Sequence, residues 1–115
     1  MARVKRGVTS RARHKSVFNK TKGFRHGRKN LIKVAKQAAD KAEKYAFIGR
    51  KLKKRQFRAL WIIKINAACR QEGVSYSQLI NGLKTNKIDI NRKDLSLMAS
   101  DKPEGFKKLV EKVKS

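Results

Sequence analysis

Thirteen lysine and arginine side chains lie between Met1 and Ala39 without a single aspartate or glutamate, and the first acidic residue is Asp40. A segment of this charge repels itself, so it needs a polyanion as its counter-ion, which in a cell is usually nucleic acid. Its arginines carry a planar group that bridges phosphate oxygens and stacks on bases, which suits irregular RNA. The chemistry that these residue types indicate is the neutralisation of phosphate.

A second cationic cluster lies in the middle of the chain, on a predicted helix. At about 100° per residue, one face of this helix carries four aligned cations. They are Lys51, Lys54, Arg55 and Arg58. A solvated helix surface normally alternates in sign, whereas residues 45–71 contain no acidic side chain. Phosphate contact therefore explains this cluster better than solubility alone.

The two cationic segments together predict twenty RNA-binding side chains. They are Arg3, Lys5, Arg6, Arg11, Arg13, His14, Lys15, Lys20, Lys22, Arg25, His26, Arg28, Lys29, Lys33, Arg50, Lys51, Lys53, Lys54, Arg55 and Arg58. Charge indicates a polyanion without saying which one, so a nucleoid-type DNA-binding protein is an alternative.

The remaining reactive residue types do not form a catalytic site. His14 and His26 lie in the basic segment with no carboxylate nearby in sequence, and Cys69 lies on an apolar helical stretch that suits a small buried side chain. A single cysteine forms no internal disulfide, and no zinc-ligand spacing is present. We expect no enzyme activity, no metal, no cofactor and no small-molecule substrate.

The location predicted from composition is the inside of a cell. One cysteine fits a reducing compartment, and no long apolar run follows the charged N-terminus as it would in a secretory signal. No segment approaches the roughly twenty apolar residues needed to cross a bilayer. We expect a soluble protein without a membrane partner.

The charge divides the chain into two regions. Residues 1–70 hold 23 basic and 2 acidic side chains, whereas residues 71–115 hold 9 and 6. Residues 1–29 contain few large apolar side chains, so we expect an arm that is largely disordered in isolation. Its stretch from Ser10 to Lys22 is expected to become helical once phosphate removes the repulsion between neighbouring cations.

A long helical pattern follows the arm. Asn30 is its expected cap and Gly73 its expected end, while Gly49 in its interior predicts a kink or break. Forty helical residues extend about 60 Å, more than a compact domain of this size can cover. Much of the helix is therefore expected to lie against a partner.

The last third of the chain predicts three short amphipathic helices. Their starts are marked by Ser75 with Gln78, by Asn91 with Asp94, and by Asp101 with Glu104 and Pro103. The segment from Trp61 to Cys69 is expected to cover their apolar faces, with Trp61 in the core. The predicted fold is all-α, with a basic arm and long helix over residues 1–58 and a small globular helical domain over residues 59–115.

Four segments carry a pattern more specific than charge. They are MARVKRGV at the start, KGFR at Lys22 to Arg25, KRQFRALWIIKINAA from Lys54 to Ala68, and SYSQLINGLK followed by IDINRKDL. Together they resemble the bacterial and organellar large-subunit ribosomal protein family numbered twenty, in order and over essentially the whole chain. That family commonly has arginine where this chain has Lys64, a change that keeps the chemistry.

The resemblance implies an all-helical protein whose extended N-terminal region threads through large-subunit ribosomal RNA and whose C-terminal domain is globular. It implies a structural role in early assembly of the large subunit, with neighbouring ribosomal proteins as further partners. Some members also repress their own messenger RNA, so a translational repressor that binds its mRNA leader is the alternative function. The expected location is the cytoplasmic ribosome, with plastid and mitochondrial ribosomes as further options.

Overall fold

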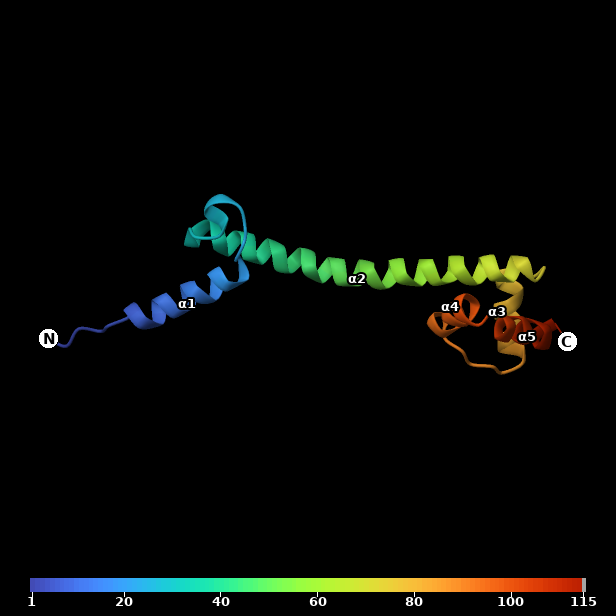
Figure 1. Ribbon diagram of the computed structural model, residues 1–115. Coiled ribbons are helices and arrows are strands. Elements are labelled where there is room, and N and C mark those ends of the chain that lie inside the picture. The colour runs from blue at the N-terminus through green and yellow to red at the C-terminus, as the bar shows by residue number, and fades with distance from the viewer. Residues whose placement is uncertain (115) are drawn as a thin grey trace. The chain divides into compact units, whose positions relative to one another are not determined.

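The computed structural model describes residues 1–114, and none of them lies in a β-strand. The elements are α1 (Gly7–Lys20), the 3-10 helix η1 (His26–Arg28), α2 (Ile32–Gln71), α3 (Tyr76–Thr85), α4 (Arg92–Asp101) and α5 (Pro103–Lys114) (Figure 1). The predicted all-α class, with one long helix followed by short ones, is confirmed. The chain divides into two compact units, Met1–Lys51 and Leu52–Ser115, and the division falls within α2.

The arm is more ordered than predicted. Helix α1 begins at Gly7, three residues before the predicted start at Ser10, and it ends at Lys20. None of its residues is buried, and its first turn has no side-chain cap at Arg6. The helix therefore has its own hydrogen-bond ladder but little packing, and its cations project into solvent.

A tight turn between α1 and α2 fixes the first unit. Thr21 is fully buried, and its hydroxyl donates to the carbonyl oxygens of Val17 and Phe18 at 3.4 Å. Gly23 has a φ of +82°, a conformation that glycine adopts without steric cost. On α2 the buried residues of this unit are Ala35 and Ala39, whose small side chains allow close approach.

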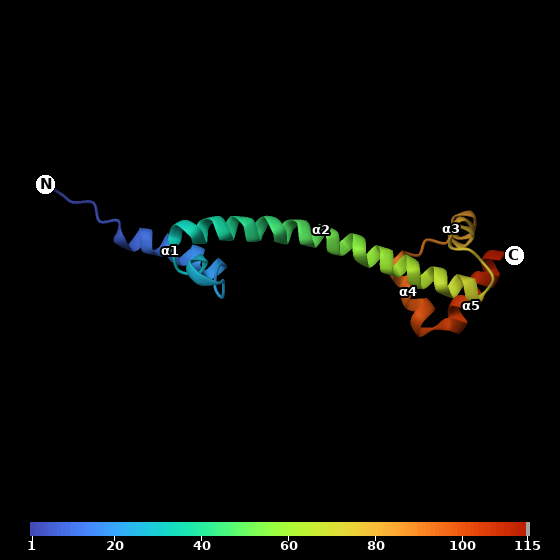
Figure 2. The same cartoon turned by 90° about the horizontal axis from the view of Figure 1, so that it is seen from above.

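Helix α2 is continuous over 40 residues, so a break at Gly49 does not occur (Figure 2). An interior glycine costs only about 1 kcal/mol relative to alanine, which is too little to interrupt a long hydrogen-bond ladder. The predicted cap is displaced as well. The Ala35 N–H donates to the Leu31 carbonyl at 2.7 Å, so Leu31 and not Asn30 precedes the first helical turn.

The predicted stop at Gly73 is confirmed. Gly73 has a φ of +70°, its N–H donates to Arg70 at 3.1 Å, and the Val74 N–H donates to Cys69 at 3.0 Å. These two bonds form a Schellman motif, which satisfies carbonyl groups at the end of α2. Val74 and Cys69 both belong to the core, so the chain turns back within the second unit onto that core.

Two of the three predicted helix starts are confirmed. Ser75 and Gln78 form a reciprocal capping box on α3, and the Asn91 side chain accepts from the Asp94 N–H at 2.8 Å on α4. The third prediction is partly wrong. Pro103 is the first residue of α5, but Asp101 is the last residue of α4.

The core of the second unit joins the end of α2 to the three short helices. Its buried members are Ile65, Cys69, Val74, Leu79, Leu83, Leu95, Phe106 and Val110. Trp61 is only partly buried and is not packed against this cluster, so its predicted place in the core is wrong. Trp61 lies one turn before Ile65, outside the part of α2 that the cluster includes.

Candidate nucleic-acid interface

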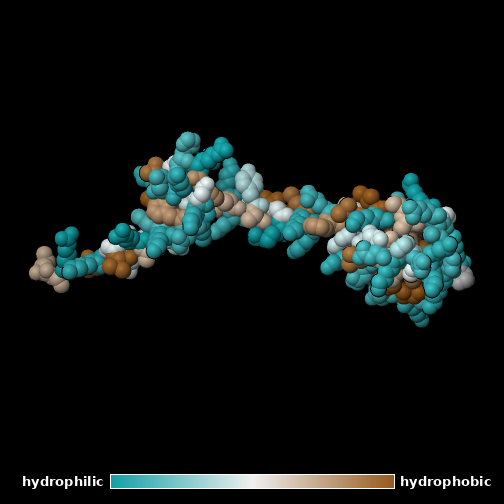
Figure 3. Space-filling model, viewed as in Figure 1, coloured by the Kyte–Doolittle hydropathy of each residue, from teal (hydrophilic) through white to brown (hydrophobic). Residues whose placement is uncertain are grey.

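The middle of α2 is exposed on every side. Each residue from position 43 to position 60 is exposed, which amounts to five turns of helix without any intramolecular cover. Large apolar side chains are included, such as Tyr45 at 62% and Phe47 at 54% exposure, and Figure 3 shows apolar groups at the surface of α2. Helices in proteins are stabilised mainly by packing, and this segment buries none of its residues within the described part of the chain.

The four predicted cations of this segment lie on one continuous helix, as their spacing indicated. Lys51, Lys54, Arg55 and Arg58 are all exposed. Aromatic rings accompany the cations: the Lys51 Nζ lies 4.4 Å from the centroid of the Phe47 ring. The surface therefore combines groups that neutralise phosphate with flat rings on which bases can stack.

The other predicted residues are spread over the first unit. The structure places Arg3, Lys5 and Arg6 before α1, Arg11, Arg13, His14, Lys15 and Lys20 on α1, Lys22, Arg25, His26, Arg28 and Lys29 between α1 and α2, and Lys33, Arg50 and Lys53 on α2. All are exposed except His14, which is partly buried. The His14 ring meets the Phe18 ring edge to face at 6.5 Å, so His14 also has a packing role.

Carboxylates neutralise little of this charge. Within residues 1–114, Lys20 is the only one of the twenty predicted residues in an ion pair, with its Nζ 2.6 Å from Glu43 Oε1. The hydrogen bond to Glu43 and the charge of that carboxylate raise the pKa of Lys20. The other nineteen predicted residues form no ion pair within residues 1–114 and remain available for phosphate.

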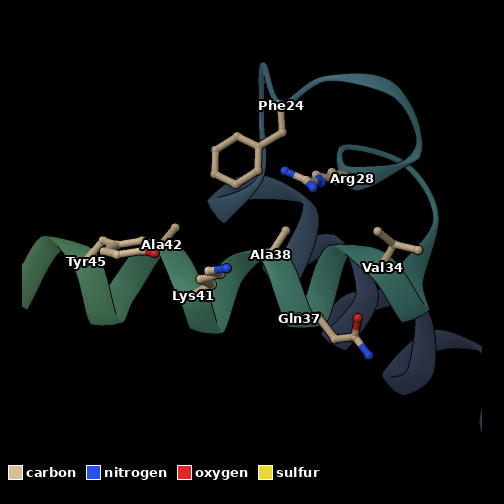
Figure 4. Close-up of a pocket in the computed structure, with 8 residues that line it drawn as sticks. All are labelled: Phe24, Arg28, Val34, Gln37, Ala38, Lys41, Ala42 and Tyr45. Carbon is tan, nitrogen blue, oxygen red and sulfur yellow. The ribbon is translucent and has the colours of Figure 1, made fainter.

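A hollow of about 560 Å³ lies between α2 and the turn that precedes it, within the first unit. Phe24 and Arg28 line it from the turn, and Ala38, Lys41 and Ala42 line it from α2 (Figure 4). Its lining contains cations and no carboxylate. This is a further place at which an anionic ligand fits the first unit.

Metal-ligating side chains and the single thiol are the remaining reactive groups within residues 1–114. No three His, Cys, Asp or Glu side chains within residues 1–114 are grouped so that they could hold a metal ion. Cys69 is fully buried, and burial raises the pKa of its thiol, which keeps it protonated. None of the helices within these residues is both long and apolar enough to cross a membrane.

The family model described as "Ribosomal protein L20" matches residues 3–109, nearly the whole chain. The chain belongs to the ribosomal protein L20 family. It is 56% identical over all its 115 residues to a large ribosomal subunit protein bL20 from Afipia carboxidovorans, covering 97% of that relative. Relatives of the same name from Francisella tularensis subsp. novicida and Coxiella burnetii are 54% and 55% identical, with at least 99% of this chain and 96% of each relative covered.

Membership of the L20 family confirms the resemblance that the four sequence segments indicated. Proteins of this family are structural ribosomal proteins, and this one is not an enzyme. The predicted cations thus lie on the exposed surfaces of a ribosomal protein.

Sequence reasoning on this L20-family chain missed the residues of the hollow. Phe24, Lys41 and Tyr45 were absent from the predicted interface, although the hollow brings them together with Arg28. The available signal was the helical spacing of Val34, Lys41 and Tyr45, which places them on one face of α2. The contribution of Phe24 depends on the turn geometry and has no signature in the spacing.

Proposed function

We propose that this protein is a structural component of the large ribosomal subunit that binds ribosomal RNA directly and promotes an early step of subunit assembly. The observation that carries the proposal is the fully exposed stretch of α2, residues 43–60, which is rich in cations and lacks any intramolecular cover. Its relatives are named as proteins of the large ribosomal subunit, which supports the identity of the partner.

The proposed mechanism is electrostatic. RNA helices that pack together bring their phosphates close, and cations held along one helix lower that repulsion over its length. The residues proposed to make these contacts are the twenty predicted ones, with Lys54, Arg55 and Arg58 at the centre of the exposed stretch. Specificity is proposed to come from RNA shape, because an irregular junction matches one arrangement of cations better than a regular duplex does.

Neighbouring ribosomal proteins are proposed as additional partners. Ile48, Leu52 and Ile63 are exposed on α2 at 40%, 43% and 65%, and phosphate cannot bury such side chains favourably. Their spacing places them on a face away from Lys54 and Arg58, but Arg55 lies only about 20° from Ile48, so the proposed RNA and protein surfaces adjoin along one edge of the helix. The proposed location is the ribosome in the bacterial cytoplasm, since the relatives named above are bacterial.

The test is an omission experiment. Large subunits are reconstituted from purified RNA and proteins with the wild-type chain, without it, and with a variant carrying Lys54→Glu, Arg55→Glu and Arg58→Glu. We expect early assembly to stall in the last two reactions. Normal particles formed at the usual rate without the chain would contradict the proposal.

Repression of the chain's own messenger RNA is a separate prediction for the second unit, which contains its own buried core. Deletion of residues 1–58 should leave repression intact if this unit selects the mRNA leader. A reporter fused to that leader measures the effect, and unchanged reporter translation in the presence of the shortened chain would count against repression.

A further inference from the structure

We propose that the hollow formed by Phe24, Arg28, Ala38, Lys41 and Ala42 holds one unstacked nucleotide of the bound RNA. The base would stack on the Phe24 ring, and its phosphate would lie near Arg28 and Lys41. This inference rests on the proposed function, because it names one contact within that RNA complex. It adds a defined site for a single base to an interface whose other proposed contacts come from the exposed cations and rings of α2.

The shape of the hollow suits a flat ring. Figure 4 shows the Phe24 ring extending from the turn over the face of α2 that carries Ala38 and Ala42. The two alanines stand one turn apart, and their small side chains leave open the space that longer ones would fill. A volume of about 560 Å³ lies within the usual range of small-ligand sites.

The charge of the hollow suits an anion. Arg28 and Lys41 line it, and no carboxylate does so. The two acidic residues of the first unit, Asp40 and Glu43, lie on a different face of α2 according to helical spacing, and Glu43 is held by Lys20. A ligand in the hollow therefore meets positive charge without competing negative charge.

The turn that supplies Phe24 and Arg28 is held in a defined conformation. Gly23 and His26 have φ values of +82° and +52°, and for histidine this is an uncommon backbone conformation. The buried Thr21 anchors the start of the turn through its bonds to α1. The backbone that carries Phe24 and Arg28 is thereby set in place before a ligand binds, which lowers the ordering cost of binding.

A nucleotide satisfies these features together better than a peptide does. It joins a planar aromatic group to a phosphate, and the hollow joins an aromatic ring to two cations. Figure 4 shows the Arg28 guanidinium between Phe24 and the N-terminal end of α2, where a backbone phosphate could reach it. An acidic peptide would use the cations but would leave the stacking surface of Phe24 without a planar partner.

The test uses the full chain bound to large-subunit ribosomal RNA and compares three variants. Phe24→Leu keeps an apolar side chain but removes the aromatic ring, and Ala42→Leu fills the hollow. Ala67→Leu is the matched control, since Ala67 is exposed on α2, lies outside residues 43–60 and does not line the hollow. Circular dichroism verifies that all three variants keep the helical content of the wild type.

We expect Phe24→Leu and Ala42→Leu to weaken RNA affinity by about 5-fold to 150-fold, the range for loss of one base stacked on an aromatic ring. Ala67→Leu should bind as the wild type does. Ultraviolet crosslinking followed by nuclease and protease digestion should attach one nucleotide to the segment around Phe24, and Ala42→Leu should abolish that product.

Equal affinity of Phe24→Leu and wild type would overturn this inference while leaving the proposed function intact. A crosslink from Phe24 to another protein in assembled subunits would also overturn it and would assign the hollow to a peptide. If the wild-type chain does not bind large-subunit RNA at all, the proposed function fails and the inference fails with it.

Discussion

Lys20 Nζ lies 2.6 Å from Glu43 Oε1 and so connects the end of α1 to α2. The pair involves one of only two acidic residues in the first 71 positions. Its side chains are 55% and 59% exposed, so water and salt screen the attraction. The contact therefore contributes little to the stability of the fold.

The pH dependence of this contact follows from the raised pKa of Lys20. Its stabilising effect is fully present below the ordinary lysine pKa of 10.5 and should disappear as the pH rises through the higher value in the folded state. Thermal melts of the wild type and Glu43→Gln across this alkaline range measure the effect. The difference between the two proteins should shrink as the pH rises, and a difference that grows would contradict the assignment.

Charge reversal of Lys54, Arg55 and Arg58 to glutamate should weaken RNA binding strongly while the helices stay folded. The slope of log affinity against log salt should become shallower by about one for each lost phosphate contact. Filter-binding titrations at several salt concentrations measure this slope. The matched control reverses Lys93, Lys107 and Lys108, three exposed cations of the second unit. Equal losses in both triple variants would show that net charge alone determines binding.

The same glycine-to-alanine change should have opposite effects on stability at two positions. At Gly49 an added Cβ meets nothing within 4 Å, so alanine should raise the free energy of unfolding by up to about 1 kcal/mol. At Gly82 on α3 an added Cβ would overlap the Val113 side chain on α5, so alanine should lower it by about 1 to 3 kcal/mol. Urea titrations followed by circular dichroism distinguish the two, and a stabilising Gly82→Ala would refute the close α3–α5 packing.

Truncation of Leu79 should destabilise the fold much more than truncation of Trp61. Leu79 is fully buried, and Leu79→Ala should lower the free energy of unfolding by about 2 to 5 kcal/mol. Trp61 lies outside the core, so Trp61→Ala should cost much less stability. A larger loss for Trp61→Ala than for Leu79→Ala in urea titrations would restore the original prediction of a core tryptophan.

Trp61 should also report RNA binding. It is the single tryptophan of the chain, and its ring lies 6.4 Å from that of Phe57 on the exposed part of α2. Its fluorescence should therefore change when large-subunit RNA is added. An emission spectrum unaffected by saturating RNA would place this part of α2 outside the contact.

Local chemistry made much of the fold predictable. The caps at Ser75 and Asn91 and the stop at Gly73 follow from hydrogen bonds within a few residues of each position, so their sequence signatures are reliable. The errors concern competition over longer range. Gly49 was expected to break a helix whose hydrogen-bond ladder outweighs it, and Trp61 was expected in a core that begins one turn later, at Ile65. The apolar character of a side chain predicts that it is buried, but does not predict which element or partner buries it.

The candidate interface has two parts, the exposed cations of α2 and the hollow near Phe24, and only the first could be predicted from the sequence. The exposed stripe with Lys54 and Arg58 follows directly from helical spacing and charge. The hollow does not, because Phe24 and Lys41 lie 17 positions apart and meet only through the backbone geometry at Gly23 and His26. Positive φ at a histidine is decided by the surrounding structure and cannot be read from residue type.

The buried position of Cys69 allows the opening of the second unit to be measured by the rate of thiol labelling. This single sulfhydryl is sealed inside the core, so a thiol-reactive dye can modify it only during moments when the core opens. The labelling rate therefore measures how often that unit opens, independently of any movement in the arm. Comparing the labelling rate of Cys69 in the free chain and in assembled particles would show how much assembly slows the opening of this core.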